Sequence, residues 1–382
     1  MCEMSEATNE AAATRCERAA AELRFGRSVV MYGIEKPMAL LALDAATPRQ
    51  FEHFRAATSH CHSLYLSPFR AKALGLRKEA DGIAVPLQDM DFDRASRLAY
   101  AARLEAPTRW SSAPPRLAKA AELARLSMLL PAIIFAEIDH DDPAFRDCQD
   151  LDESDLAEAK KTAALSFDVI ARAPVPLNDL GTCEFVVFRG GIAQRDQIAI
   201  VVGQPKMSGP VPVRIHSSCI TGDLLGSLKC DCGDQLKNGM RALAALGGGV
   251  MLYLDQEGRG TGIGAKLRAY GYQDSGFDTI DADAELGFGP DEREYSTAVA
   301  ILRLLGIGRV NLLTNNPAKT AFLTSHGIEV EKQTPITGTL TAENSKYLRA
   351  KATRAGHIFC PEFLPSSDWI SKGPLGKYRQ AD

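Results

Sequence analysis

The chain of 382 residues is long enough for two domains, each with its own hydrophobic core. Its composition, 45% hydrophobic and 24% charged, is that of a globular protein, and its formal net charge of −4 excludes a general electrostatic attraction to nucleic acid or anionic membranes. No apolar run reaches the ~18 residues of a membrane span, and the N-terminal residues lack a signal-peptide pattern. We therefore expect a cytoplasmic protein with no nucleic-acid or membrane partner.

The first half of the chain alternates predicted helices and strands. Residues 8–26 are rich in Ala, Glu, Arg and Leu, which favours a helix ended by glycine. Thr47-Pro48 is typical of a helix cap followed by a first-turn proline, which predicts a helix over 49–58. Other patterns predict strands at 28–32, 39–43, 62–66 and 132–138 and helices at 91–104, 115–129 and 153–167. This alternation indicates an α/β or α+β domain over residues 1–172.

A second domain is predicted after a proline-containing segment. Pro174 and Pro176 fall within residues 171–179 and predict a linker there. Later patterns predict strands at 184–188, 198–202, 211–216, 250–254 and 310–313 and helices at 235–245, 263–273, 295–305 and 318–326. We therefore expect a second α/β domain over residues 173–366, followed by a C-terminal tail, residues 367–382.

Three of the nine cysteines form a cluster in the sequence. Cys219, Cys230 and Cys232 are spaced so that their thiolates can meet at one Zn²⁺ if the chain between them folds back. Zinc takes four tetrahedral ligands, and three protein ligands leave a position for a water whose pKa the metal lowers. His216 is an alternative fourth ligand, which would make the site structural. Buried cysteines without a metal are the other alternative.

Three further segments carry polar residues where an α/β sheet usually binds ligands. The glycine-rich turn 254–262 lies between a predicted strand and helix, where backbone N–H groups and Arg259 can bind phosphate. The segment 291–295 is highly charged and precedes a helix. Thr314 and Lys319 follow the predicted strand 310–313, at its carboxyl end. Taken alone, the first two segments are better explained as a tight turn and a solvated helix start, and the third is as readily an ordinary loop.

Taken together and in this order, these segments resemble the GTP cyclohydrolase II family over about residues 175–365. The landmarks include Arg214-x-His216-Ser217-x-Cys219-x-Thr221-Gly222-Asp223, Cys230-Asp231-Cys232-Gly233, Gln256-Glu257-Gly258-Arg259, Asp291-x-Arg293 and Leu312-Leu313-Thr314-Asn315-Asn316-Pro317-x-Lys319. The resemblance implies a mixed sheet with flanking helices. It also implies hydrolysis of GTP at C8 of the imidazole ring, the first step of riboflavin biosynthesis. The products would be formate, pyrophosphate and 2,5-diamino-6-ribosylamino-4(3H)-pyrimidinone 5′-phosphate.

The resemblance also implies metal and substrate ligands. Cys219, Cys230 and Cys232 would hold one Zn²⁺ per subunit, and Mg²⁺ would accompany the triphosphate of GTP. The residues implied to bind GTP are Arg214, Ile215, His216, Ser217, Ser218, Gln235, Glu257, Gly258, Arg259, Thr279, Thr314 and Lys319. Family members of this kind favour a homodimer, which we therefore expect here.

Three catalytic residues are implied in the same way. Asp291 would accept a proton, Arg293 is the group proposed to attack the α-phosphate, and Tyr270 would lie near the reacting ring. A charged guanidinium has a pKa above ~12 and no free lone pair, which argues against Arg293 as a nucleophile. Stabilising the charge of the departing pyrophosphate is the physically easier role for Arg293.

The first half resembles 3,4-dihydroxy-2-butanone 4-phosphate synthase, although less specifically. The resemblance rests on Glu22-Leu23-Arg24-x-Gly26-Arg27, Ala46-Thr47-Pro48, Leu74-Gly75-Leu76 and Pro131-Ala132-Ile133-Ile134-x-Ala136-Glu137-Ile138. That synthase needs several acids in the loop after its first strand to hold Mg²⁺, and the corresponding segment, 31–39, contains only Glu35. We therefore expect a degenerate, non-catalytic domain that supports folding or dimerisation.

Two other functions remain open from the sequence. The first is a sibling cyclohydrolase that stops at a formylated intermediate or serves another pathway. Departures from the usual family pattern at Ser218, Thr261, Gly264, Ala265 and Asp283 bear on that product specificity. The second is a non-catalytic nucleotide-binding regulator. The retained cysteine cluster argues against the regulator, because an inactive relative would be free to lose it.

Overall fold

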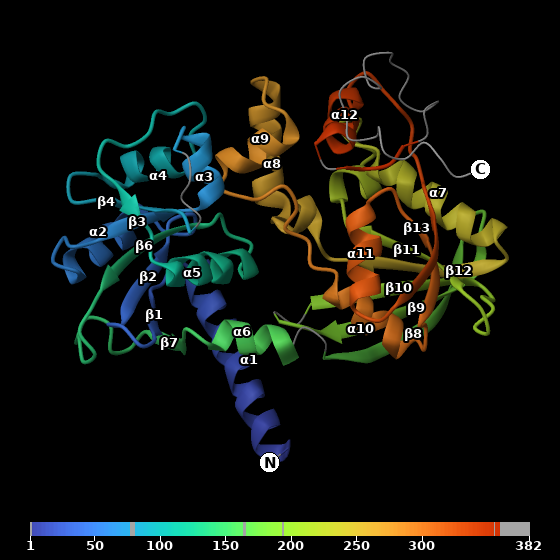
Figure 1. Ribbon diagram of the computed structural model, residues 1–382, viewed down its shortest axis with the longest axis horizontal. Coiled ribbons are helices and arrows are strands. Elements are labelled where there is room, and N and C mark those ends of the chain that lie inside the picture. Colours follow the sequence, from blue (N-terminus) through green and yellow to red (C-terminus); the bar gives the residue numbers. More distant parts are fainter. Residues whose placement is uncertain (1, 77–80, 163–165, 193–194, 355, 360–382) are drawn as a thin grey trace. The chain divides into compact units, whose positions relative to one another are not determined.

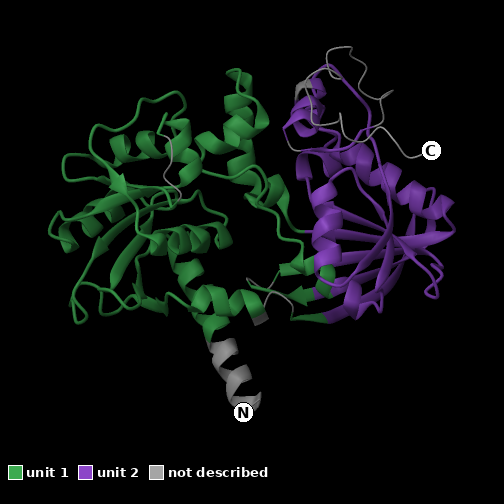
Figure 2. Cartoon of the chain, in the orientation of Figure 1, with its two compact units in different colours: residues 1–168, 189–196, 255–300 green, residues 169–188, 197–254, 301–382 purple. Residues whose placement is uncertain are grey.

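The computed structural model describes residues 2–76, 81–162, 166–192, 195–354 and 356–359. These residues form two compact units (Figure 2). Unit 1 comprises residues 1–168, 189–196 and 255–300, and unit 2 comprises residues 169–188, 197–254 and 301–382. The chain carries two mixed sheets with flanking helices, so the predicted α/β class is confirmed (Figure 1). The expected tail, residues 367–382, lies outside the described residues.

The first sheet lies in unit 1 and has seven strands in the order β5-β4-β3-β6-β2-β1-β7. Most neighbouring strands are antiparallel, whereas β1 and β7 are parallel. The strands are β1 (Val29–Tyr32), β2 (Met38–Ala42), β3 (Ser63–Leu66), β4 (Ile83–Pro86), β5 (Ser111–Ser112), β6 (Ala132–Glu137) and β7 (Gln149–Asp152). The four strands predicted in this region correspond to β1, β2, β3 and β6.

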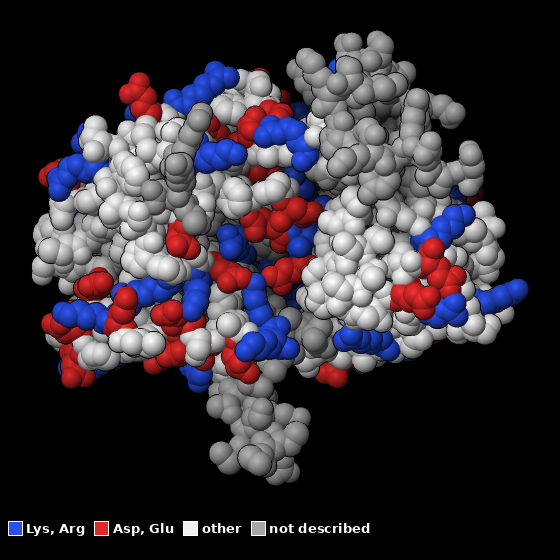
Figure 3. Space-filling view, in the orientation of Figure 1, with Lys and Arg blue, Asp and Glu red and all other residues white. Residues whose placement is uncertain are grey.

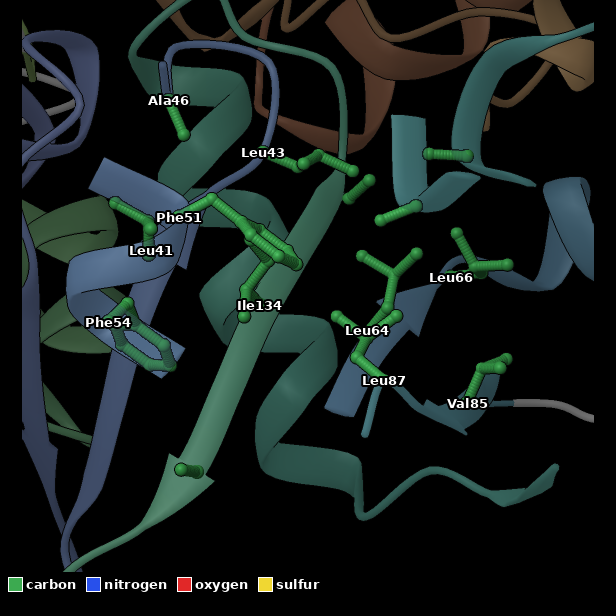
Figure 4. Packing of buried hydrophobic residues seen from close by; sticks show 14 of the residues in the cluster. Leu41, Leu43, Ala46, Phe51, Phe54, Leu64, Leu66, Val85, Leu87 and Ile134 are labelled. Atoms are coloured by element: carbon green, nitrogen blue, oxygen red, sulfur yellow. The ribbon is translucent and has the colours of Figure 1, made fainter. Parts of the chain in front are cut away.

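Helices cover both faces of this sheet because both sets of alternating side chains are apolar. Leu41 and Ile134 point into a cluster that Phe54 of α2 completes (Figure 4). Leu40 and Ile133, one position earlier on each strand, belong to the cluster on the opposite face, with residues of α1, α5 and α6. The helices are α1 (Cys2–Arg24), α2 (Pro48–Ala57), α3 (Pro68–Ala73), α4 (Phe92–Tyr100), α5 (Pro115–Leu126) and α6 (Asp155–Thr162).

The start of α2 shows why local sequence patterns succeed here. The Thr47 side chain accepts a hydrogen bond from the backbone N–H of Gln50, and the Gln50 side chain accepts one from the backbone N–H of Thr47. Pro48 occupies the first turn, where a missing N–H leaves no partner unsatisfied. The predicted helix start is therefore confirmed.

Unit 1 also contains residues 255–300, which follow the second domain's central strands in the sequence. This segment includes a short turn, Glu257–Gly260, and the helices α8 (Gly262–Asp274) and α9 (Thr279–Glu285). It also includes most of α10 (Ser296–Leu304). Helix α9 packs against α3. The expected domain boundary after residue 172 stays a prediction. The two units are defined by contacts in space and each combines several stretches of the chain, whereas the predicted domains are continuous stretches of sequence.

The second sheet is mixed and has the order β14-β13-β11-β12-β10-β9-β8. Strand β11 is parallel to both of its neighbours, β12 and β13, whereas β12 is antiparallel to β10. The strands are β8 (Phe167–Leu177), β9 (Gly181–Gly190), β10 (Arg195–Gly203), β11 (Val211–Ser217), β12 (Gly248–Leu254), β13 (Arg309–Leu313) and β14 (Glu329–Thr334). The flanking helices in unit 2 include α7 (Cys232–Ala245), α11 (Pro317–Ser325) and α12 (Ser345–Thr353).

The predicted linker at residues 171–179 is wrong. Most of that segment belongs to β8, which continues to Leu177. Strand β8 lies at an edge of the sheet, where Pro174 and Pro176 remove no hydrogen bond from the interior of the ladder. The prolines were therefore evidence for an edge strand as much as for a linker.

The surface and the helices add two observations about possible partners. Lys and Arg side chains are interspersed with Asp and Glu over the face of unit 1 seen in Figure 3. Among the helices that the structure describes, none combines the length and apolarity required to cross a bilayer.

Candidate active site

Three parallel strands in the interior of the second sheet end side by side, and the line of their carboxyl ends is called the strand edge below. Because β11, β12 and β13 run in the same direction, the residues that follow them lie close together. The backbone N–H of Ser218, just after β11, donates to the carbonyl oxygen of Leu254 at the end of β12 (2.8 Å). Thr314 follows β13 directly and is buried. This edge therefore collects residues from three of the segments that the sequence singled out.

The three clustered cysteines converge beside this edge. Their sulfur atoms all lie within 4.8 Å of one another, and the Sγ atoms of Cys219 and Cys230 are 3.7 Å apart. Zn–S bonds of ~2.3 Å in a tetrahedron separate neighbouring sulfurs by ~3.8 Å, so the donor set fits zinc. Hydrogen bonds of the Cys232 thiol with Cys219 and Cys230, together with burial, hold the pKa of that thiol well above its usual value. A bound divalent cation would displace the thiol protons and stabilise the sulfur atoms as thiolates.

Gly222 makes this convergence sterically possible. A Cβ atom at position 222 would lie 2.9 Å from the Sγ of Cys230 and 3.1 Å from the Sγ of Cys219. The first contact is shorter than real Cβ atoms make and the second is tighter than most, so a side chain here would displace the sulfur atoms. The glycine between the first and second cysteines therefore lets the chain turn tightly over the sulfur atoms.

His216 faces a carboxylate rather than the sulfur cluster. Its Nε2 lies 3.1 Å from both carboxylate oxygens of Asp223, and its ring stacks on Tyr253. Asp223 also accepts hydrogen bonds from the hydroxyl of Tyr253 (3.0 Å) and the backbone N–H of Cys219 (2.9 Å). Burial lowers the pKa of His216, although the hydrogen bond with Asp223 opposes that shift. Among the described residues, the side chains placed to hold a metal ion together are Cys219, Cys230 and Cys232, and His216 is not one of them.

Arg214 is a buried cation at the same strand edge. Its guanidinium donates to the carbonyl of Leu313 (3.1 Å) and to the side chain of Gln235 (2.8 Å), which extends from α7. Burial lowers its pKa to about 10. In the part of the chain that the structure describes, Arg214 Nε has no hydrogen-bond partner although it is buried. A buried donor of this kind is well suited to a ligand.

Lys319 supplies a second buried positive charge near β11. Its Nζ donates to the carbonyl oxygen of Ile215 (2.7 Å), and the side chain is 7% exposed. Asn316 caps α11 by accepting a hydrogen bond from Ala318, which holds the helix start beside Thr314. Ser217 ends β11, and Ser218 begins the loop that leads to the first cysteine. Two buried cations at one strand edge suit an anionic ligand.

The glycine-rich turn lies in unit 1 and has an unusual backbone. Gly258 and Arg259 both have φ of 62°, in the left-handed region that residues other than glycine seldom adopt. The carboxylate of Glu257 accepts hydrogen bonds from Lys266 and from the N–H of Gly258. Arg259 donates to the carbonyl of Pro290 (2.7 Å). These bonds hold a strained turn, as is common where a backbone binds a ligand.

Arg259 also contacts a buried carboxylate. One of its nitrogens lies 2.9 Å from an oxygen of Asp283 on α9. Burial raises the pKa of Asp283 to about 6, and the charge of Arg259 only partly opposes the shift. Thr279, at the start of the same helix, is buried as well. Arg259 therefore links the turn to α9.

Asp291 and Arg293 form a bidentate ion pair, with N···O distances of 2.7 and 2.6 Å. Burial alone would raise the pKa of Asp291, but the hydrogen bonds from Arg293 hold it below its usual value. Both groups are therefore charged in this arrangement. Tyr270 lies on α8 with the Nζ of Lys266 5.7 Å from its ring centre.

The predicted site residues thus fall into two groups. Unit 2 brings together the predicted metal ligands and GTP ligands Arg214, Ile215, His216, Ser217, Ser218, Cys219, Cys230, Cys232, Gln235, Thr314 and Lys319. Unit 1 holds the remaining predicted residues, namely Glu257, Gly258, Arg259, Tyr270, Thr279, Asp291 and Arg293. Within each group, hydrogen bonds connect some of the members, such as Arg214 with Gln235 and Asp291 with Arg293.

Comparison with known proteins supplies the family. Residues 168–335 match the model of the family described as GTP cyclohydrolase II. GTP cyclohydrolase-2 of Xylella fastidiosa strain 9a5c is 54% identical over 349 residues, which cover 91% of this chain and 87% of that protein. The chain belongs to the GTP cyclohydrolase II family. The predicted enzyme class, a GTP cyclohydrolase II of riboflavin biosynthesis, is thereby confirmed.

Other relatives extend the comparison. GTP cyclohydrolase-2 of Azospirillum brasilense is 37% identical over 367 residues, with 92% of this chain and 95% of that protein covered. Among solved structures, a two-domain 3,4-dihydroxy-2-butanone 4-phosphate synthase from A. baumannii covers 78% of this chain and 93% of its own at 17% identity. Its TM-score is 0.31, so that overlay carries no argument about this chain.

Some polar contacts of the candidate site were missed by sequence reasoning. Asp223 was part of a recognised motif, but its contacts with His216, Tyr253 and the backbone of Cys219 were not anticipated. An acid placed four residues after the first cysteine was the available signal. The partnership of Lys266 with Glu257 had no comparable signal, because nine positions separate the two residues.

Proposed function

We propose that this chain hydrolyses GTP in a zinc-dependent reaction that opens the imidazole ring at C8. Formate and pyrophosphate would leave, with 2,5-diamino-6-ribosylamino-4(3H)-pyrimidinone 5′-phosphate as the remaining product. The convergence of Cys219, Cys230 and Cys232 is the observation that supports zinc dependence. When bound there, zinc supplies a water of lowered pKa for hydrolysis. We also propose one zinc per subunit, with Mg²⁺ accompanying the triphosphate.

In this proposal, the residues of unit 2 bind and orient GTP. Arg214 and Lys319 provide buried positive charge at the strand edge, and Gln235 fixes the direction of Arg214. Asp223 holds the ring of His216 by accepting its hydrogen bond. The polar groups of Ser217, Ser218 and Thr314 and the backbone of Ile215 complete the part of the predicted GTP-binding set that lies in unit 2.

The residues of unit 1 serve the phosphate and proton-transfer steps. Glu257, Gly258 and Arg259 lie in the turn, where the guanidinium of Arg259 suits phosphate. Thr279 and Tyr270 are proposed to contact the nucleotide. Asp291, ionised beside Arg293, is available to accept a proton.

We expect Arg293→Ala to slow pyrophosphate release about 100-fold. The bidentate bond with Asp291 keeps the guanidinium charged and fixes its direction, so its role is to stabilise developing negative charge. Release of pyrophosphate from GTP is measured with purified zinc-loaded protein. An unchanged rate would remove Arg293 from the mechanism. Arg189→Ala, which removes an exposed arginine paired with Asp196, serves as the control.

The overall assignment is tested by measuring two products separately. Zinc-loaded protein is incubated with GTP and Mg²⁺, and both formate and pyrophosphate are expected to accumulate in equal amounts. Pyrophosphate without formate would favour the sibling cyclohydrolase that stops at a formylated intermediate. Release of neither product would favour a nucleotide-binding regulator.

We further propose that the first half of the chain is a non-catalytic, degenerate relative of 3,4-dihydroxy-2-butanone 4-phosphate synthase. The β1–β2 loop, 33–37, contains a single acid, Glu35, whose carboxylate is 3.5 Å from Arg116. One acid held by an arginine is a poor cation site. A cytoplasmic location and a homodimer, the latter implied by the family resemblance, complete the proposal.

A further inference from the structure

Residues 255–300, which carry the proposed phosphate and proton-transfer groups, are packed against the first half of the chain. Leu130, which precedes β6, shares a buried cluster with Ala269 of α8 and with Leu286 and Phe288 after α9. The hydroxyl of Ser67 donates to the carbonyl oxygen of Gly287 (2.6 Å). The contact is therefore both apolar and hydrogen-bonded.

Arg70 of α3 is the centre of this contact. Its side chain is 1% exposed and forms an ion pair with Glu285 at the end of α9. The same guanidinium donates to the carbonyl oxygens of Leu98 (2.9 Å), Ala101 (2.7 Å) and Glu285 (3.0 Å). One buried cation therefore joins α3, the end of α4 and α9.

A second set of contacts surrounds Arg293 itself. The residues on either side of Arg293 are both acidic, and each carboxylate reaches a basic residue of the first half. Glu294 lies 2.8 Å from the Nζ of Lys160 on α6, and Glu292 lies 3.7 Å from the Nε of Arg125 on α5. Glu292 also accepts a hydrogen bond from the N–H of Gly289 (2.7 Å). The loop before α10 is thus held on both sides of Arg293.

We infer that the first half of this chain acts as a positioning platform for the loop that carries Asp291 and Arg293, with Lys160 and Arg125 as positioning residues. This inference rests on the proposed function. Partly exposed ion pairs add little to the free energy of unfolding. Displacing a reacting group by as little as an ångström, in contrast, can lower a rate by up to two orders of magnitude. A platform of this kind therefore predicts a loss of rate without a matching loss of stability.

Lys160→Met tests the inference in the full-length, zinc-loaded protein. We expect kcat for pyrophosphate release to fall roughly ten-fold, while the KM for GTP, the zinc content and the thermal midpoint stay unchanged. Lys160→Arg, which restores the positive charge, is expected to recover most of kcat. The matched control is Lys119→Met, because Lys119 lies on α5 and pairs with Glu153 inside the first half (2.8 Å).

Amide hydrogen exchange provides a readout that does not depend on activity. Residues 289–295 are expected to exchange faster in Lys160→Met than in Lys119→Met. Equal exchange in the two variants, or equal kcat, would overturn the inference. If the unaltered protein released no formate and no pyrophosphate, the proposed function would fail, whereas the exchange comparison would still decide whether Lys160 holds the loop.

Discussion

Cys230→Ser is expected to abolish zinc binding and to reduce formate release by roughly 10³-fold or more. Serine cannot replace a thiolate as a zinc ligand at neutral pH, and the two remaining thiolates leave the metal without a stable site. Without the metal, hydrolysis depends on a water with its ordinary pKa of ~15.7 instead of ~7. Zinc content by mass spectrometry and formate release from GTP are measured on the same preparation.

Cys61→Ser is the control for loss of a thiol. Cys61 is exposed and lies in unit 1, whereas the three-cysteine cluster belongs to unit 2. Zinc content and activity should therefore match those of the unaltered protein. Retention of a full zinc complement by Cys230→Ser would mean that the metal binds elsewhere.

Arg70→Met is expected to lower the free energy of unfolding of unit 1 by about 3–5 kcal/mol, because it leaves the carboxylate of Glu285 buried without its partner. The carbonyl oxygens of Leu98, Ala101 and Glu285 also lose their donor. Urea denaturation followed by circular dichroism measures the change. Zinc content should stay near that of the unaltered protein, since the cysteine cluster lies in unit 2.

Two companion variants make the Arg70 experiment specific. Glu285→Gln keeps an oxygen that can accept a hydrogen bond from Arg70, so its loss of stability should be smaller. Lys36→Met removes an exposed ion pair with Asp139 and should leave the urea midpoint unchanged. A loss below about 1 kcal/mol in Arg70→Met would show that apolar contacts, not this ion pair, hold α9 in place.

Much of the fold could be predicted because its signals are local. A few neighbouring residues are enough to predict the start of α2, from its cap and proline. The same holds for the apolar strands β1, β2, β3 and β6. Short or polar elements were not predicted: α9 has seven residues, and β14 is Glu329–Thr334, with five polar residues in six. Such segments are fixed by their neighbours rather than by their own periodicity.

The packing of residues 255–300 against the first half could not be predicted from one sequence. Arg70 and Glu285 are separated by 215 positions, and neither lies in a pattern that names its partner. The cysteine cluster, in contrast, was recognisable because thiols at short spacing have few other uses in a reducing compartment. The orientation of His216 toward Asp223 depends on backbone geometry that spacing does not specify.

The two prolines of β8 also affect how this protein behaves in concentrated solution. An exposed edge strand offers unpaired backbone groups that another chain can extend into a continuous sheet, which is a common route to aggregation. On β8, Val169 and Ile170 are exposed apolar residues that would favour such growth. Pro174 and Pro176 have no N–H to donate, so an incoming strand cannot complete its ladder there. The residues first interpreted as a linker thus help to keep this edge from recruiting other chains.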